Sequence, residues 1–132
     1  MKKKEKIIHP ERTSVNDRIW PFSDAVTVDG WLYISGQGPV DFSTGAFLLG
    51  SIEDETHRTL HNISCLVQAA GGTMEDIVKC NVYLADINDW QKFSDVYTTY
   101  FPSTKPARTT VQSGLGFGIK IEIDAVAKIP TT

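Results

Sequence analysis

The chain has 132 residues, of which 41% are hydrophobic and 22% are charged, and this composition excludes a disordered chain. Its formal net charge of −3 and its pI near 5.5 disfavour binding to nucleic acid, and no apolar run approaches the roughly 20 residues that span a bilayer. We expect a single domain over residues 1–132, in which residues 1–20 form a partly loose N-terminal segment. The start lacks the apolar region of a signal peptide, and the two cysteines fall within a predicted helix and a predicted strand, which favours free buried thiols over a disulfide. We therefore predict a cytoplasmic protein that binds neither membranes nor nucleic acid.

The first third of the chain predicts three short strands. Residues 5–9 are a strand candidate, and the alternating segments 25–28 and 31–35 flank the pair Asp29-Gly30. Asp-Gly between alternating apolar residues is a strong signal for a two-residue hairpin turn. We therefore expect the second and third strands to form a β-hairpin.

The middle of the chain predicts a helix and then a fourth strand. Ser51 and Asp54 have the spacing of a helix N-cap, and Gly71-Gly72 has the character of a C-terminal stop. A strand pattern follows over residues 77–84. The residues that recur at helical spacing, and are expected to face the core, are Ile52, Thr56, Leu60, Ile63, Val67 and Ala70.

The last third predicts a second amphipathic helix followed by two strands, over residues 107–112 and 119–127. The glycine-rich segment between the strands is not a phosphate-binding loop, because a strand rather than a helix follows it, and we interpret it as a hairpin connection. The helix has an aromatic stripe that we expect to face the core, since no basic residue beyond Lys92 interleaves with it as stacking on bases would require. This stripe consists of Trp90, Phe93, Tyr97 and Tyr100.

These elements give the order βββαβαββ, which predicts an α+β fold with one mixed sheet and two helices on one face. Two helices cover only one face of such a sheet. The other face also carries apolar side chains, so we expect the chain to associate with copies of itself.

Two polar patterns are candidate sites. His57 and His61 have the i, i+4 spacing of a zinc-binding helix but lack its glutamate, so we interpret them as a solvated helix face and predict no bound metal. If the last two strands formed a hairpin around Leu115, Arg108 would face Glu122. The residues alone favour a cross-strand ion pair worth about 0.2–1 kcal/mol. The alternative is an anion site in which Arg108 binds a carboxylate and Glu122 holds a water molecule.

Several segments in order, from Pro21 to Ala127, resemble the RidA family, also called YjgF or, in older naming, the L-PSP endoribonuclease family. The resemblance covers the entry to the first hairpin, the serine-glycine turn, both helices and the last two strands. The segments that carry it are PFSDAV, YISGQGPVD, ETHRTLHNISCLVQAAGGTMEDIVKCNVYLADINDW, VYTTYF, KPARTTV and IEIDAVA.

The resemblance implies a homotrimer of chorismate-mutase-like subunits around a central barrel-like core, with sites in clefts between subunits. It implies an imine/enamine deaminase that needs no cofactor and hydrolyses compounds such as 2-aminoacrylate to keto acids and ammonia. In that branch of the family an arginine binds the substrate carboxylate and a glutamate positions water, and Arg108 and Glu122 occupy those places. Ser35 and Gly36 occupy the place of the family's serine-glycine pair.

Three positions depart from the deaminase pattern. Phe22 stands where tyrosine is usual, Thr110 where cysteine is frequent, and Ser94 where some members have asparagine. We expect Phe22 to form an apolar wall from the neighbouring chain, and backbone groups near Gly36 and Thr110 to complete the pocket. The departures favour a substrate larger than aminoacrylate, such as an aminomuconate-type enamine. The alternatives are a regulatory trimer that binds small carboxylates without turnover and a ribonuclease, which the acidic pI disfavours.

Overall fold

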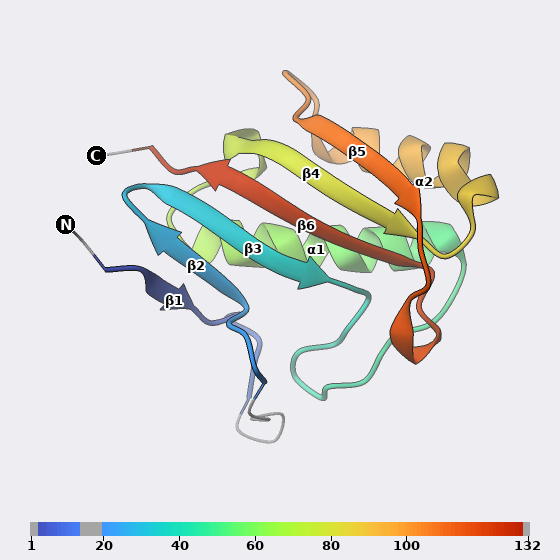
Figure 1. Cartoon of the computed structure of the whole chain (residues 1–132), viewed down its shortest axis with the longest axis horizontal. Coiled ribbons are helices and arrows are strands. Elements are labelled where there is room, and N and C mark those ends of the chain that lie inside the picture. Colours follow the sequence, from blue (N-terminus) through green and yellow to red (C-terminus); the bar gives the residue numbers. More distant parts are fainter. Residues whose placement is uncertain (1–2, 14–19, 131–132) are drawn as a thin grey trace.

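The computed structural model describes residues 3–13 and 20–130, which form one mixed sheet with two helices packed across one of its faces (Figure 1). The sheet order is β1-β2-β3-β6-β4-β5, and every neighbouring pair is antiparallel except β4 and β5, which are parallel. The elements are β1 (Glu5–Ile7), β2 (Ala25–Val28), β3 (Trp31–Gln37), α1 (Ile52–Ala69), β4 (Ile77–Leu84), α2 (Trp90–Tyr97), β5 (Ala107–Gln112) and β6 (Ile121–Lys128).

Local sequence explains the ends of these elements. Asp29 and Gly30 both adopt a positive φ, 52° and 82°, as a two-residue hairpin turn between right-twisted strands requires. The hydroxyl of Ser51 accepts the backbone N–H of Asp54 at 3.0 Å and caps α1. The helix ends where Gly71 adopts a φ of 93°. The predicted hairpin, helix cap and glycine stop are all confirmed.

The predicted hairpin between the last two strands is wrong. β5 pairs only with β4, whereas β6 lies between β3 and β4. The connecting segment crosses the end of β4, because Ser113 N–H donates to the Leu84 carbonyl at 2.9 Å and Ala85 N–H donates to the Lys120 carbonyl at 3.0 Å. The segment is therefore a crossover. Arg108 lies beside Cys80, and Glu122 lies beside Tyr83.

The core lies between the sheet and the helices. Alternate residues of β6, such as Ile121 and Ile123, are fully buried against apolar residues of α1 such as Leu60 and Ile63. Each such side chain contributes about 1.5–3 kcal/mol relative to an exposed position. Within the described residues, no helix is both long enough and apolar enough to cross a membrane.

The second face of the sheet is not covered by either helix (Figure 1). Trp31 and Tyr33 are 38% and 46% exposed there, and Asp124 accepts hydrogen bonds from Asn81 Nδ2 at 2.8 Å and from the Tyr83 hydroxyl at 2.9 Å. An apolar and hydrogen-bonded face without a covering layer agrees with the expectation of self-association, and the trimer stays a prediction.

Candidate active site

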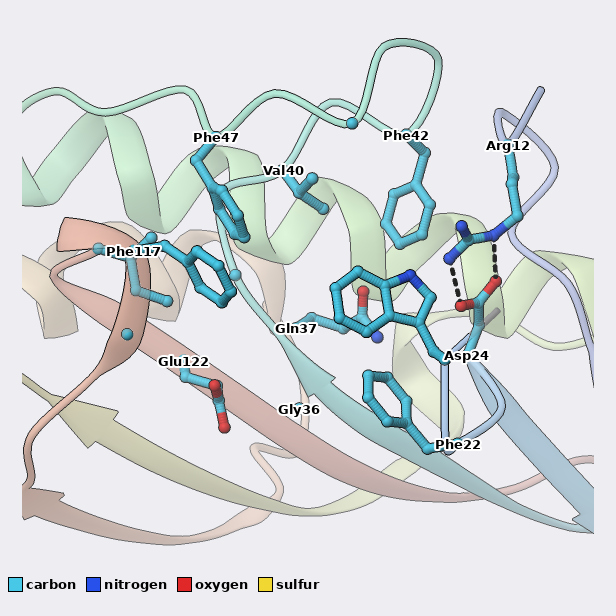
Figure 2. A pocket seen from close by; sticks show the side chains of 15 residues that line it. Arg12, Phe22, Asp24, Gly36, Gln37, Val40, Phe42, Phe47, Phe117 and Glu122 are labelled. Carbon is cyan, nitrogen blue, oxygen red and sulfur yellow. Dashed lines mark hydrogen bonds and ion pairs between the residues drawn. The ribbon is translucent and has the colours of Figure 1, made fainter. Parts of the chain in front are cut away.

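A cavity of about 280 Å³ lies beside the start of β6, between the segment that follows β3 and the crossover segment (Figure 2). Glu122 and Gly36 line it along the sheet. Figure 2 shows Phe47 and Phe117 together on one side of the cavity and Phe22 on the other. A half-enclosed space with one carboxylate among aromatic rings has the character of a small-molecule site.

The carboxylate of Glu122 reaches the cavity because residue 36 has no side chain. A Cβ atom built on Gly36 would lie 2.5 Å from Oε2 of Glu122, which is closer than real Cβ atoms come to any neighbour. Desolvation raises the pKa of Glu122, and the negative charge of Asp124 raises it further. A carboxyl group with a raised pKa both accepts and returns a proton more readily near neutral pH.

A single buried carboxylate holds the two loops of the cavity. Glu55 of α1 is 0% exposed and accepts the backbone N–H groups of Gly50 at 3.1 Å and Lys120 at 2.7 Å. Gly50 lies three residues after Phe47, and Lys120 lies three residues after Phe117. The ammonium group of Lys120 also donates to Glu55 at 3.3 Å. Glu55 therefore holds the two loops that carry Phe47 and Phe117, although it does not line the cavity itself.

An ion pair closes the other end of the cavity. Arg12 donates to both carboxylate oxygens of Asp24, at 2.6 Å and 3.1 Å, and its guanidinium lies 4.8 Å from the centre of the Phe42 ring. A bidentate pair of this kind satisfies the aspartate and neutralises the arginine. Sequence reasoning missed it, because Arg12 lies in a segment interpreted as a loop with no periodic signal.

Arg108 lies away from this cavity, on the face of the sheet that carries the helices. Its guanidinium lies 4.8–5.1 Å from the ring centres of Trp90, Phe93 and Tyr97, and one nitrogen donates to the Ser94 hydroxyl at 3.1 Å. Three ring faces around a cation stabilise and orient it. Within the described part of the chain Arg108 forms no ion pair, so its charge is available to an anion from outside the chain. Phe93 and Tyr97 of the predicted aromatic stripe are buried as expected, whereas Trp90 is 43% exposed, and all three rings contact Arg108.

The prediction that Arg108 and Glu122 face each other on one side of the sheet is wrong. Arg108 pairs with Cys80, which is fully buried beneath the helices, whereas Glu122 pairs with Tyr83, which bonds to Asp124 on the opposite face. The alternation of side chains along a strand puts the two charged groups on opposite faces.

The other predicted site residues divide between these two places. Thr110 pairs with the buried Val82, so it lies on the side of Arg108. Phe22 and Gly36 line the cavity with Glu122. Ser35 adjoins this second group, and its hydroxyl donates to the Ser23 carbonyl at 2.6 Å, which fixes the segment that carries Phe22. One chain therefore carries two groups of candidate residues rather than one complete site.

The histidines do not form the helical pair that their spacing suggests. His57 Nδ1 lies 2.9 Å from the Tyr100 hydroxyl, whereas His61 Nε2 lies 3.0 Å from Glu11. The latter contact is a hydrogen bond between side chains on the partly exposed surface.

Possible metal donors of His9, Glu11 and Cys65 lie within 4.8 Å of one another. However, His9 Nδ1 accepts the backbone N–H of Glu11 at 3.1 Å, so the neutral ring carries its proton on Nε2 and offers no lone pair there. Burial lowers the pKa of His9 to about 4 and raises the pKa of the Cys65 thiol. This arrangement fits a buried neutral histidine, and the absence of a metal stays a prediction.

One mixed sheet, two helices on one face and a cavity beside the last strand define the fold class to which the solved YjgF and L-PSP proteins belong, as predicted. The family model described as Endoribonuclease L-PSP matches residues 14–129. The chain belongs to this family, the RidA/YjgF family.

Relatives and solved structures agree with this assignment. The chain is 43% identical over 110 residues to the 2-iminobutanoate/2-iminopropanoate deaminase of Homo sapiens, covering 83% of this chain and 80% of that protein. It is also 43% identical over 110 residues to a RutC family protein of Pyrococcus horikoshii, covering 83% and 87%. The structure of E. coli TdcF with bound serine has a TM-score of 0.84 at 32% identity and covers 96% of this chain and 100% of that one. RidA from an Antarctic Psychrobacter has a TM-score of 0.84 at 30% identity, covering 95% and 100%.

Proposed function

We propose that this protein is an imine deaminase that hydrolyses 2-imino carboxylates, or the enamines that tautomerise to them, to keto acids and ammonia. The names of the deaminase relatives support this activity, and the serine bound to E. coli TdcF supports a site for small amino-acid-like ligands. The chain itself offers the two groups that the chemistry needs. These are Arg108, a cation with no acidic partner within residues 3–13 and 20–130, and Glu122, a carboxylate of raised pKa beside a cavity.

We further propose that each active site is shared by two copies of the chain. The observation that carries this proposal is the position of Arg108 and Glu122 on opposite faces of one sheet. A small imino acid cannot touch both faces at once. If both residues act on one substrate, Arg108 must therefore come from one copy and Glu122 from its neighbour, as the expected trimer allows.

The proposed reaction needs positioning and proton transfer rather than a covalent nucleophile. Arg108 binds the substrate carboxylate by paired N–H donors. Glu122 takes a proton from water as the oxygen adds to the C=N carbon, and it delivers that proton to the nitrogen. The hydroxyl proton of the resulting carbinolamine then moves to the nitrogen as the C–N bond breaks, which leaves the keto acid and ammonia, so one water is consumed for each imine. Phe22 contributes an apolar wall, and backbone groups near Gly36 and Thr110 complete the pocket.

Two alternatives make different predictions. A non-catalytic trimer that binds small carboxylates would fit the missing tyrosine hydroxyl at Phe22, and it would bind keto acids without accelerating ammonia release. A ribonuclease would fit the description of the family model. The net charge of −3 and the carboxylate of Glu122 in the cavity repel a polyanion, so we favour the deaminase.

The test is complementation between two inactive variants. We expect Arg108→Ala to lower turnover about 10- to 150-fold, because a charged hydrogen bond contributes about 1.5–3 kcal/mol. Glu122→Gln should lower turnover without weakening the binding of a keto acid. If the variants are co-refolded in equal amounts, about a quarter of the shared sites should contain both native residues and regain activity.

The measurement is ammonia release from imines generated in place. The control is a mixture of the two variants that are refolded separately and assayed before their subunits exchange. No recovery in the co-refolded sample, at a native oligomeric mass, would contradict the shared site. Turnover of Arg108→Ala equal to that of the parent would remove Arg108 from the mechanism.

A further inference from the structure

The cavity beside Glu122 is lined by an unusual number of aromatic rings. Phe47 and Phe117 stack at 4.6 Å between ring centres and are nearly parallel, at 16° (Figure 2). Trp20 and Phe22 form a second pair at 5.6 Å. The lining aromatic residues are Trp20, Phe22, Phe42, Phe47 and Phe117. Rings on both sides of one carboxylate form an apolar slot.

Phe117 is unusual both in the exposure of its ring and in its backbone conformation. Its side chain is 66% exposed, although a phenyl ring is usually withdrawn from water. Its φ of 61° lies in the left-handed region, which residues other than glycine rarely adopt. Exposed rings and strained backbone that persist together are typical of ligand sites.

The charges of the cavity bear on which side chain would fit. Among the described residues that line it, Arg12, Asp24 and Glu122 are charged. Arg12 and Asp24 neutralise each other through their bidentate pair, so the described part of the lining carries a net negative charge from Glu122. A substrate with a second carboxylate in its side chain would be repelled, and an aminomuconate-type enamine is one such compound.

The size of the cavity indicates more than a methyl or ethyl group. Its volume of about 280 Å³ lies near the lower end of the roughly 300–1,000 Å³ range of small-molecule pockets. A substrate with a methyl side chain would leave most of this space filled by water against aromatic rings. A phenyl or branched aliphatic side chain would displace that water.

We propose that the slot defined by these five aromatic residues selects 2-imino acids with large, uncharged, apolar side chains, above all aromatic ones. The proposal rests on the imine deaminase function proposed above and adds the class of substrate. The carboxylate and the imine carbon lie toward Glu122 and the neighbouring copy's Arg108, and the side chain inserts between the rings.

The experiment compares two imines that differ only in side chain. D-Amino acid oxidase generates 2-iminopropanoate from D-alanine and 2-imino-3-phenylpropanoate from D-phenylalanine. The kcat/KM for each is measured as acceleration of imine loss over the uncatalysed rate. We expect the phenyl substrate to be favoured about tenfold, and Phe117→Ala to lower its kcat/KM about tenfold while changing that of the methyl substrate less than twofold.

Leu48→Ala is the matched control, because Leu48 is 44% exposed on the same loop as Phe47 and does not line the cavity. This variant should change neither kcat/KM. Equal kcat/KM for the two imines in the parent protein would overturn the proposal. So would a Phe117→Ala variant that loses activity toward both imines equally or changes its mass in light scattering, because the ring would then serve assembly. Failure to accelerate either imine would instead contradict the deaminase function itself.

Discussion

Glu55→Ala should destabilise the fold and disorganise the cavity, although Glu55 does not line it. The side chain is 0% exposed and accepts two backbone N–H groups, from Gly50 and Lys120, together with the Lys120 ammonium. Its removal leaves both N–H groups without their partner in a partly buried place. Leaving a buried donor unpaired costs about 1–3 kcal/mol, and two N–H groups lose their acceptor here, so we expect a loss of about 2–5 kcal/mol in the free energy of unfolding.

Urea unfolding, followed by tryptophan fluorescence, measures this loss as a lower midpoint at an unchanged slope. Glu55→Gln keeps one acceptor oxygen and should lose about 1–3 kcal/mol. Glu53→Ala is the matched control on the same helical turn, where only an interaction with the helix dipole worth less than about 1 kcal/mol is removed. An alanine variant at position 55 as stable as the parent would refute the view that this carboxylate fastens the two loops.

Two further predictions concern Glu122. Gly36→Ala should lower the rate of imine hydrolysis about tenfold or more while leaving the free energy of unfolding nearly unchanged. The added Cβ would displace the flexible end of the Glu122 side chain rather than the backbone. Unchanged activity would contradict this contact. The pKa of Glu122 is raised by desolvation and then by Asp124, so the acid limb of kcat, which reports the substrate-bound enzyme, should lie above the usual range of a glutamate and vanish in Glu122→Gln.

Sequence patterns predicted the parts of the fold that depend on local chemistry. The Asp29-Gly30 turn, the Ser51 cap and the glycine after α1 each satisfy a backbone requirement within a few residues, so the sequence contains the whole signal. The pairing of β5 does not depend on nearby residues. Period-2 alternation shows which residues share a face of one strand, but it does not show which strand lies alongside or which face the helices cover.

The candidate site shows the same division. Glu122 was singled out from the strand pattern, and Phe22 and Gly36 through the family resemblance; all three line one cavity, and their roles stay predictions. Phe47 and Phe117 were missed, because loop residues have no periodicity and a positive φ at phenylalanine has no sequence signature. Glu55 did leave a signal, since it is an acid on the face of α1 that carries Ile52 and Thr56, where a charge requires a buried partner.

The two groups of candidate residues carry charges of opposite sign, a cation at Arg108 and a carboxylate at Glu122. Arg108 is oriented by three rings and by Ser94 but has no acidic partner among the described residues, whereas Glu122 has a raised pKa beside an open cavity. If two copies bring them together without substrate, the guanidinium should lower the pKa of Glu122. A substrate carboxylate bound between them neutralises the guanidinium and restores the raised pKa. In the proposed site, Glu122 therefore becomes the stronger base when the substrate is bound.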